Sequence, residues 1–527
     1  MSERSLSAEG SRFAIAAPHF EATRAGLAAF DAGGNALDAA LAAAVTLAVV
    51  YPMACGVGGD LFALVQQPDG QVTALNASGA APLAVDRDML RRLGPDMPER
   101  GPFTVTVPGA VSGWRRLHRL GTTLPWERAF GPAIGLARDG IPVASSLALS
   151  LSEDEELLAD PGLRGVFTRD GRALREGEPL RQPALARTLE TLAAEGSDAI
   201  YGGDVGRAYV DGLRAAGSPI SIEDLAEHEE DLVAPLIGAY RDLHVRVVPP
   251  NSQGFVLLQI LAAVERLGIH PDPLGPDAAM LAEIARACSL DRDRHNADPR
   301  RAHVPFEALI DDGHIAAICD LVTSGRAPSD PPAVPAGGDT IALVTADAEG
   351  HAVSLIQSLA SGFGSGILEP ATGIIAHNRG SQFSLDPASP NVLEGRKRPA
   401  HTLMPVVVHR DGKLAAVSGT MGGGGQPQIN AMSLIRAFDL GLSPIETLHA
   451  PRWLAGGMEL GLEEKTIDLE SSAPASVADS FSRSGFRLIL RGELDEWLGQ
   501  AHLIVTRRDG SLAVAADPRS DGEAAAR

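Results

Sequence analysis

The spacing of apolar residues near the start of the chain predicts two helices. An amphipathic pattern covers residues 23–32, a Gly-Gly-Asn turn follows at 33–35, and an apolar, alanine-rich run fills residues 39–51. Asn35 is a suitable N-cap for the second helix, and Pro52 is expected to end it. This run is much shorter than the roughly 20 apolar residues that cross a bilayer. We therefore expect a buried helix in a soluble protein.

Further along the chain the periodicity changes. Residues 153–287 show a mostly helical pattern with charged faces. Three later stretches, 340–358, 404–419 and 501–517, alternate apolar and polar residues around a short turn that contains Asp and Gly. This pattern is typical of β-hairpins. The sequence thus predicts a helix-rich N-terminal two-thirds and a sheet-rich C-terminal third.

Composition and charge narrow the function classes. The chain has 527 residues and a formal net charge of −22, because 67 acidic side chains outnumber 45 basic ones. This balance argues against a nucleic acid or an anionic membrane as a partner. Cys55, Cys288 and Cys319 lack the spacing of a disulfide framework or a metal site, and we expect neither a metal nor a cofactor. The first residues contain no apolar segment typical of a signal peptide, so a cytoplasmic location is expected.

Glycine is unusually abundant, with 57 residues that follow no collagen-like period. We expect these glycines to serve turns, tight packing and close approaches of the backbone to a ligand. The sequence contains no HExxH, Walker A or GxSxG motif, and no GxGxxG after a strand. Candidate catalytic residues therefore have to be identified from a feature other than these motifs.

That feature is the junction between Asp339 and Thr340. Residues 322–339 are rich in Pro, Gly and Ala and predict a flexible segment, and Thr340 opens a strand directly after it. If the Asp339–Thr340 bond were cut, Thr340 would carry a hydroxyl nucleophile and its own α-amine as the base. With a pKa near ~7.7–8.0, such an amine is partly neutral at neutral pH. From the spacing alone, an ordinary strand threonine remains the alternative.

Several motifs occur in a fixed order along the chain: GGNALDAALAAAVTLAVVYPMACGVGGDLFALV, VPGAVSGW, ARDGIPV, ISIEDL, VVPPNSQG, DTIALVTADAEGHAVSLIQSLASGFGSGI, FSLDPASPN and GTMGGGGQPQ. In these motifs the chain resembles, from about Ala16 to Asp517, the γ-glutamyltransferase family of N-terminal nucleophile hydrolases. Within this family, the chain resembles the branch of γ-glutamyltransferase-like and oxamate amidohydrolase-like proteins.

The resemblance implies an α+β fold, a four-layer αββα sandwich that forms when a proenzyme cleaves itself. A large subunit of residues 1–339 and a small subunit of residues 340–527 would together make one intertwined domain, and a dimer of such heterodimers is one expected assembly. Among the catalytic residues, Thr340 falls on the nucleophile. Ser358 falls on a second hydroxyl residue that is a threonine elsewhere in the family. Gly422 and Gly423 fall on the pair whose backbone N–H groups would form the oxyanion hole.

The resemblance also implies substrate-binding residues. Arg87 falls on the arginine that clamps a substrate carboxylate, a role that suits the two parallel donors of a guanidinium. The two serines that assist it are replaced by His401 and Thr402, which can still donate hydrogen bonds.

The residues that bind the substrate's α-ammonium group in the family are changed here. An asparagine, a glutamine and an aspartate are replaced by Ala360, Arg379 and Gln382. A pocket that loses an acid and gains a guanidinium no longer favours a cation. We expect it to prefer an anion.

The expected function is that of an autoprocessed threonine amidohydrolase, which hydrolyses a small carboxylate-bearing amide through an acyl-enzyme on Thr340. One alternative is a true γ-glutamyltransferase or glutathione hydrolase. Another is an inactive homologue that serves as a binding protein. The presence of Thr340, Ser358 and the glycine pair argues against the inactive homologue.

Overall fold

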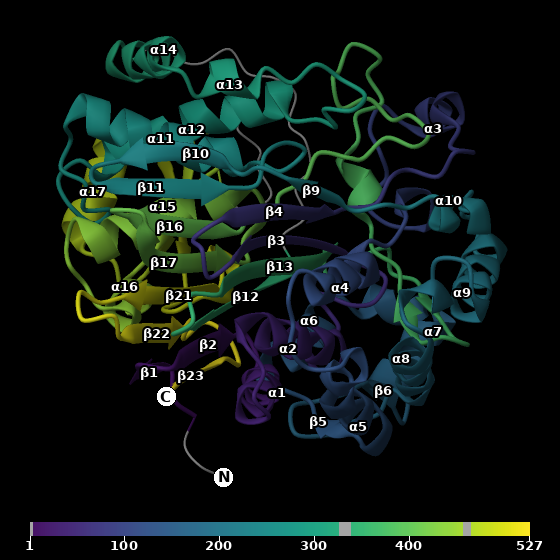
Figure 1. Cartoon of the computed structure of the whole chain (residues 1–527). Helices are drawn as coiled ribbons and strands as arrows, with labels where there is room; N and C mark the ends of the chain where they lie inside the picture. Colours follow the sequence, from purple (N-terminus) through teal and green to yellow (C-terminus); the bar gives the residue numbers. More distant parts are fainter. Residues whose placement is uncertain (1–3, 326–338, 457–464) are drawn as a thin grey trace.

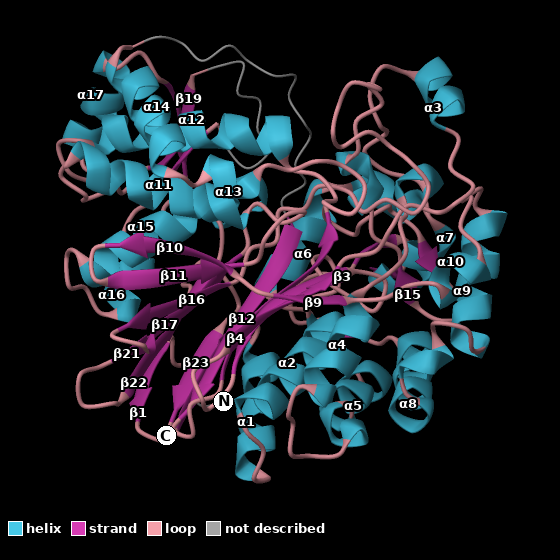
Figure 2. Ribbon diagram, turned by 45° about the horizontal axis from the view of Figure 1, so that its top comes forward, coloured by secondary structure: helices cyan, strands magenta, loops and turns pink. Residues whose placement is uncertain are grey.

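Two seven-stranded antiparallel sheets lie face to face at the centre of the molecule, and helices cover their outer faces (Figures 1 and 2). The computed structural model describes residues 4–325, 339–456 and 465–527. The first sheet has the strand order β1 (Ser7–Gly10), β22 (Leu512–Ala516), β21 (Ala501–Thr506), β17 (Lys413–Thr420), β16 (Val406–Arg410), β11 (Leu243–Val247) and β10 (Leu236–Tyr240). The second has the order β23 (Glu523–Ala526), β2 (Phe13–Ala17), β12 (Asp339–Asp347), β13 (Ala352–Ala360), β3 (Asp60–Gln66), β4 (Val72–Ala77) and β9 (Asp231–Val233).

Three hydrophobic cores define the layers. One lies between the two sheets and includes Ala342 and Ile356 of the second sheet and Val417 of the first. The outer core of the second sheet packs against helices α1 (Phe20–Asp31), α2 (Ala36–Val50), α4 (Ala110–Arg119), α5 (Gly131–Asp139) and α8 (Pro183–Glu195). The outer core of the first sheet packs against α11 (Gly254–Leu267), α12 (Ala278–His295), α14 (Asp312–Thr323), α15 (Gln426–Phe438), α16 (Pro444–His449) and α17 (Ala475–Arg483). This arrangement confirms the expected α+β αββα sandwich.

The buried helix predicted near the start of the chain is α2, and every one of its residues is buried. Asn35 caps it by accepting hydrogen bonds from the N–H groups of Leu37 and Asp38, and Asp38 accepts one from the N–H of Asn35 in return. From strand β12, Thr345 donates a hydrogen bond to the carbonyl of Ala36, at a distance of 2.8 Å. The helix therefore supports the strand that Thr340 opens.

The three predicted hairpins are confirmed as β12–β13, β16–β17 and β21–β22. The mostly helical prediction for residues 153–287 is wrong for part of that range, where β9, β10 and β11 occur. In β11 the residues Leu243, Val245 and Val247 are buried and His244 is exposed, which is the two-residue period of a strand. Five residues are too few to stand out from the helical pattern on either side.

The prediction of a flexible segment at 322–339 is wrong at its two ends, because α14 continues to Thr323 and β12 begins at Asp339. The rest of that segment, from 326 to 338, lies outside the described residues. Strands β12 and β13 lie between β2 and β3 in the second sheet, so chain segments from both sides of residue 339 interleave. Within the described ranges, no helix is long and apolar enough to cross a membrane.

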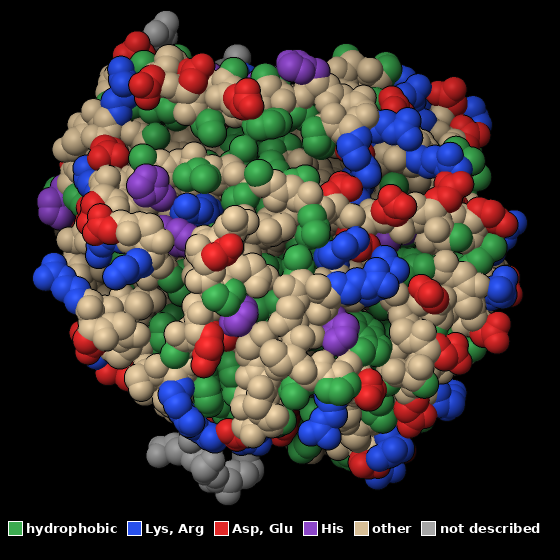
Figure 3. Space-filling model, in the orientation of Figure 1, with side chains coloured by type: hydrophobic (Ala, Val, Ile, Leu, Met, Phe, Trp, Pro, Cys, Tyr) green, Lys and Arg blue, Asp and Glu red, His purple; other side chains and the backbone are tan. Residues whose placement is uncertain are grey.

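Acidic and basic side chains are interspersed over the face of the molecule that Figure 3 shows. The net charge of −22 is therefore not gathered there in one broad acidic area.

Candidate active site

Thr340 lies at an irregularity in the hairpin β12–β13. Asp339 pairs with Ala360 and Ile341 pairs with Gln357, so the register shifts at Thr340. A bulge of this kind re-aims a side chain and is common beside active sites. The Thr340 Oγ1 hydroxyl donates a hydrogen bond to Ser358 Oγ at 3.0 Å, and both residues are buried. The structure thus brings together the two hydroxyl residues that the sequence singled out.

The glycine pair follows strand β17, which faces β12 across the inner core. Gly419 packs closely on Ala342, since a Cβ atom added to Gly419 would lie 3.2 Å from the Ala342 Cβ. The end of β17 is therefore at the same end of the sandwich as Thr340. Gly422 and Gly423 have φ values of 142° and 50°, which favour glycine.

Gly422 is the N-cap and Gly423 the first residue of the helical turn η6 (Gly423–Gly425), which leads into helix α15. The first N–H groups of a helix lack an internal partner. In the described part of the chain, neither the N–H of Gly422 nor that of Gly423 donates to another protein group. Two unused donors at this position can stabilise an oxyanion.

Arg379 begins the turn η5 (Arg379–Gln382) and is completely buried. Its Nη1 donates to Thr402 Oγ1 at 3.3 Å, and its Nη2 donates to Ser358 Oγ at 3.4 Å. Its Nε has no hydrogen-bond partner among the described residues. Burial lowers the pKa of Arg379 to about 10, while Asp60 acts to raise it, so the guanidinium is charged at neutral pH. A buried cation with long hydrogen bonds and an unused donor can bind an anion.

Asp60 is a second buried charge close to Arg379, and its side chain is fully shielded from solvent. Its Oδ1 accepts a hydrogen bond from the N–H of Gly79 at 2.9 Å, and its Oδ2 lies 3.0 Å from His401 Nε2 and 3.5 Å from His377 Nδ1. Burial alone would raise the pKa of Asp60, but His377, His401 and Arg379 lower it to about 2. Asp60 is therefore an anion at neutral pH.

His401 is held inside the protein at both ring nitrogens. Nε2 contacts Asp60 as described, and Nδ1 accepts a long hydrogen bond of 3.4 Å from the N–H of Leu403. Burial, together with the charge of Arg379, lowers the pKa of His401 to about 3. His401 is neutral at neutral pH, and its Nε2 faces Asp60.

Gln253 connects the loop of Thr402 to the glycine loop. Its Nε2 donates to the carbonyl of Thr402 at 2.7 Å and to that of Gly423 at 2.9 Å. Arg292 holds the other end of this amide, because its Nη1 lies 3.2 Å from Gln253 Oε1. A continuous set of contacts thus runs from Thr340 through Ser358, Arg379, Thr402 and Gln253 to Gly423.

The remaining predicted residues are placed differently. Gln382 lines a small cavity of about 30 Å³ together with His401 and Thr402. Arg87 begins helix α3 (Arg87–Leu93), is partly exposed, and lies on an outlying helix in both ribbon views. In the described ranges, no hydrogen bond or ion pair joins Arg87 to Thr340 or Arg379.

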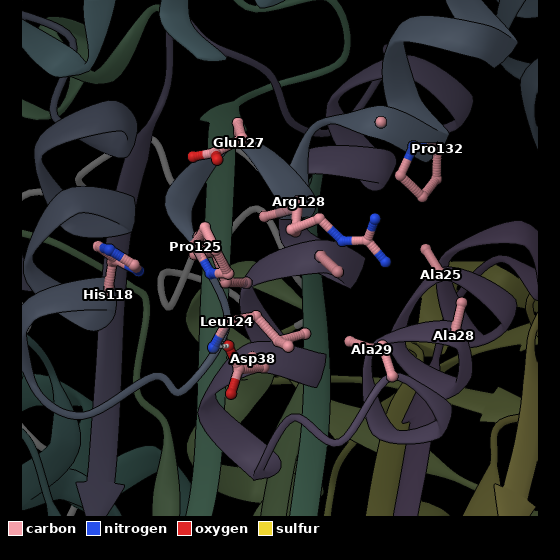
Figure 4. A pocket seen from close by; sticks show the side chains of 15 residues that line it. Ala25, Ala28, Ala29, Asp38, His118, Leu124, Pro125, Glu127, Arg128 and Pro132 are labelled. Atoms are coloured by element: carbon pink, nitrogen blue, oxygen red, sulfur yellow. Dashed lines mark hydrogen bonds between the residues drawn. The ribbon is translucent and has the colours of Figure 1, made fainter. Parts of the chain in front are cut away.

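A different cavity, of about 390 Å³, lies between α1, α2 and residues 118–132 (Figure 4). Six of its fifteen lining residues are alanines, and Arg128 extends over it. Asp38 at its base is engaged by the N–H groups of Thr123 and Leu124. None of the residues that surround Thr340 lines this cavity, so it is not the candidate active site.

Sequence reasoning missed three residues that shape the site: Asp60, His377 and Gln253. Asp60 ends the GVGGD motif and Gln253 lies in VVPPNSQG, so both were inside motifs that carried the resemblance. The feature that could have identified them in the sequence is a carboxylate or amide side chain directly beside glycine. His377, which contacts Thr106 as well as Asp60, lies just before Arg379 in a buried loop and had no local signal. Among the described residues, no group of three or more His, Cys, Asp and Glu side chains is arranged to hold a metal ion.

The four-layer sandwich has the fold of the N-terminal nucleophile hydrolases. The model of the gamma-glutamyltranspeptidase family matches residues 22–527. The chain therefore belongs to this family, and it is an enzyme of the N-terminal nucleophile hydrolase class.

Three similar proteins place it within the family. The chain is 36% identical over 520 residues to the glutathione hydrolase-like YwrD proenzyme of Bacillus subtilis, covering 98% of each chain. It is 37% identical over 522 residues to the oxamate amidohydrolase proenzyme of Klebsiella pneumoniae, covering 97% of each. The crystal structure of cephalosporin acylase from Bacillus halodurans superposes with a TM-score of 0.89 at 31% identity, covering 100% of this chain and 98% of that one. The resemblance seen in the sequence is confirmed.

Proposed function

We propose that this enzyme is an autoprocessed threonine amidohydrolase that hydrolyses a small amide with a carboxylate on its acyl group. One observation carries the proposal: the buried guanidinium of Arg379 is only two hydrogen bonds away from Thr340 Oγ1, through Ser358 Oγ. An acyl group bound to Thr340 would therefore have a cation within a few atoms of its carbonyl carbon.

Maturation is the first step of the proposed mechanism. Cleavage between Asp339 and Thr340 would produce a large subunit of residues 1–339 and a small subunit of residues 340–527. The new α-amine of Thr340 would then serve as the base for the hydroxyl of the same residue. The relatives named above are described as proenzymes, which supports this step.

Acyl transfer would follow on the mature enzyme. Thr340 Oγ attacks the amide carbonyl while the α-amine takes the hydroxyl proton. The N–H groups of Gly422 and Gly423 stabilise the oxyanion, and the leaving amine receives the proton as the C–N bond breaks. A water molecule then hydrolyses the ester on Thr340 and releases the acid.

Substrate selection is assigned to Arg379, with Thr402 and Ser358 holding its guanidinium in place. The charge of Arg379 disfavours an ammonium group at the same position. The name of the oxamate amidohydrolase relative supports a short substrate of this kind, since oxamate carries a carboxylate next to its amide. Gln382 would border the bound substrate, while His401 would act through Asp60. Arg87 would serve as a second carboxylate ligand only for a longer acyl group.

The test compares γ-glutamyl-p-nitroanilide with glutaryl-p-nitroanilide, which lacks the α-amino group. We expect a higher kcat/KM for the glutaryl compound, and release of ammonia from oxamate. A clear preference for the γ-glutamyl compound would show that the protein is a γ-glutamyl hydrolase or transferase instead.

A further inference from the structure

We infer that Asp60 is the internal counter-ion of Arg379, and that the charge balance of this buried pair selects which charge a substrate carries on its acyl group. The inference rests on the proposed function and goes beyond it. It makes Asp60 a positioning residue that acts through Arg379 and sets substrate selectivity.

The fold places Asp60 next to the reaction centre. Asp60 is the first residue of β3, and its Cα partner across the ladder is Ser358, whose hydroxyl contacts both Thr340 and Arg379. Its side chain is 0% exposed. A fully buried carboxylate is costly unless other groups compensate its charge.

The Asp60 carboxylate accepts hydrogen bonds from neutral groups. These bonds use its acceptor sites but do not neutralise its negative charge. Gly79 donates a backbone N–H, and His401 donates from Nε2 while its Nδ1 accepts from Leu403. His377 uses its Nε2 to reach the carbonyl of Thr106 at 2.9 Å, and a carbonyl only accepts. That nitrogen therefore carries the ring hydrogen, so a neutral His377 turns an unprotonated Nδ1 towards Asp60.

Arg379 supplies the compensating charge. Asp60 is the acidic group whose charge acts on Arg379, and among the described residues no carboxylate forms an ion pair with that guanidinium. Burial lowers the pKa of His377, as it does that of His401, so both rings are neutral at neutral pH and Arg379 is the remaining cation that acts on Asp60. Because the two ions do not bind each other directly, the donors of Arg379 stay available to a ligand.

This arrangement determines the charge of the substrate. Asp60 supplies one anion and Arg379 one cation, and a substrate carboxylate would share Arg379 with Asp60. Loss of the guanidinium would leave the site negative, which favours an ammonium-bearing amide. Loss of the Asp60 charge would leave the site positive, which strengthens the preference for an anion.

The experiment uses the full-length protein and its variants Asp60→Asn, Arg379→Gln and the double variant. For each, kcat/KM is measured with glutaryl-p-nitroanilide, with uncharged pentanoyl-p-nitroanilide and with γ-glutamyl-p-nitroanilide. The readout is the ratio of the glutaryl to the pentanoyl value. Thermal unfolding of all four proteins is measured in parallel.

We expect Arg379→Gln to lower the glutaryl-to-pentanoyl ratio by about 10- to 100-fold, the range of a lost charged hydrogen bond, and to raise relative activity on the γ-glutamyl compound. We expect Asp60→Asn to raise the glutaryl-to-pentanoyl ratio several-fold. Both single variants should lower the Tm, and the double variant should lose less than the sum of the two losses, because no unpaired charge remains. A residue with a purely structural role would not raise the ratio.

Asp347→Asn is the matched control, because Asp347 is a buried acid at the far end of strand β12 that accepts the N–H of Ala36. This variant should lower the Tm and leave the ratio unchanged. A lower ratio in Asp60→Asn, or additive losses of Tm, would overturn the inference. If the wild type itself showed no preference for the glutaryl compound, the proposed function would fail, while the Tm cycle would still report whether the two charges are coupled.

Discussion

At the scale of single residues, the hydroxyl of Thr340 is positioned by the irregular pairing of its own hairpin. The register shift at Thr340 turns its side chain to Ser358, whose oxygen also accepts the N–H of Ala360 at 2.8 Å. Ala360 has a φ of 82°, uncommon for a residue with a Cβ atom. These features fix the geometry around the bond that we propose to be cut.

Cleavage at Thr340 can be tested on a denaturing gel. The wild type should give two bands, near ~35 and ~20 kDa in proportion to the subunit lengths, because the nucleophile of a mature enzyme is the new N-terminal residue. Thr340→Ala removes that hydroxyl and should remain a single band. Thr345→Ala is the matched control, since it removes another buried hydroxyl from the same strand. It should still be cleaved, and cleaved Thr340→Ala would disprove the assignment.

A substitution in the glycine pair Gly422–Gly423 is expected to slow catalysis. Gly422→Ala places a Cβ atom 2.6 Å from Ile429 Cδ1, so something there has to shift, and it strains the backbone at a φ of 142°. We expect kcat to fall by about 10²–10³, the usual cost of losing one oxyanion donor. Gly412→Ala adds similar backbone strain at a φ of 75° in a turn with open space around it. It should lower stability alone, and an equal loss of kcat in both variants would contradict the oxyanion assignment.

At the scale of elements, helix α2 connects the N-terminal part of the chain to the strand of Thr340. Removing its cap with Asn35→Ala should lower the free energy of unfolding by about 1 kcal/mol, measured by urea denaturation. Because Asn35 lies at the end of α2 remote from the catalytic groups, kcat/KM should stay within twofold. Ser443→Ala removes a similar capping box from α16 and gives a reference for the stability change. A loss of activity specific to Asn35→Ala would show that the cap positions the site.

Elements with local signals could be predicted from the sequence, and elements without them could not. The cap at Asn35 and the three hairpins depend on residues close together in the chain, so they could be recognised from the sequence. Strand β11 has only five residues and lies among helical patterns, so its two-residue period could not be recognised. For the site, family resemblance supplied Thr340, Ser358, Arg379 and Thr402. It could not supply the Asp60–His401 contact, because the two residues are 341 positions apart.

At the scale of the whole molecule, the candidate site is assembled from both sides of residue 339. Asp60 and Gln253 come from the N-terminal side, and Thr340, Arg379 and Gly423 come from the C-terminal side. Interleaved strands would hold these parts together after the proposed cleavage. Conditions that destabilise the packing of the two sheets should therefore disrupt all parts of the site together.

Acid is such a condition, because several histidines are buried as neutral groups. Burial lowers the pKa of His228 and His401 to about 3, and that of His502 to about 4. In the unfolded chain these rings titrate near ~6.5. As the pH falls below that value, the unfolded state binds protons that the folded state does not. The contribution to stability is therefore full above pH ~6.5 and is lost progressively down to the folded pKa values.

We expect the free energy of unfolding, measured in urea, to fall steadily between pH 6.5 and pH 4.5. His502 is a suitable reporter, since it is fully buried and neither ring nitrogen has a hydrogen-bond partner among the described residues. His502→Gln should make the decline shallower by up to ~1.4 kcal/mol per pH unit, the value of one proton. His244→Gln, at an exposed position of β11, should leave the slope unchanged. A wild-type stability that stays flat across this range would show that the buried rings are not neutral, which would also remove the basis for treating His401 as a neutral donor to Asp60.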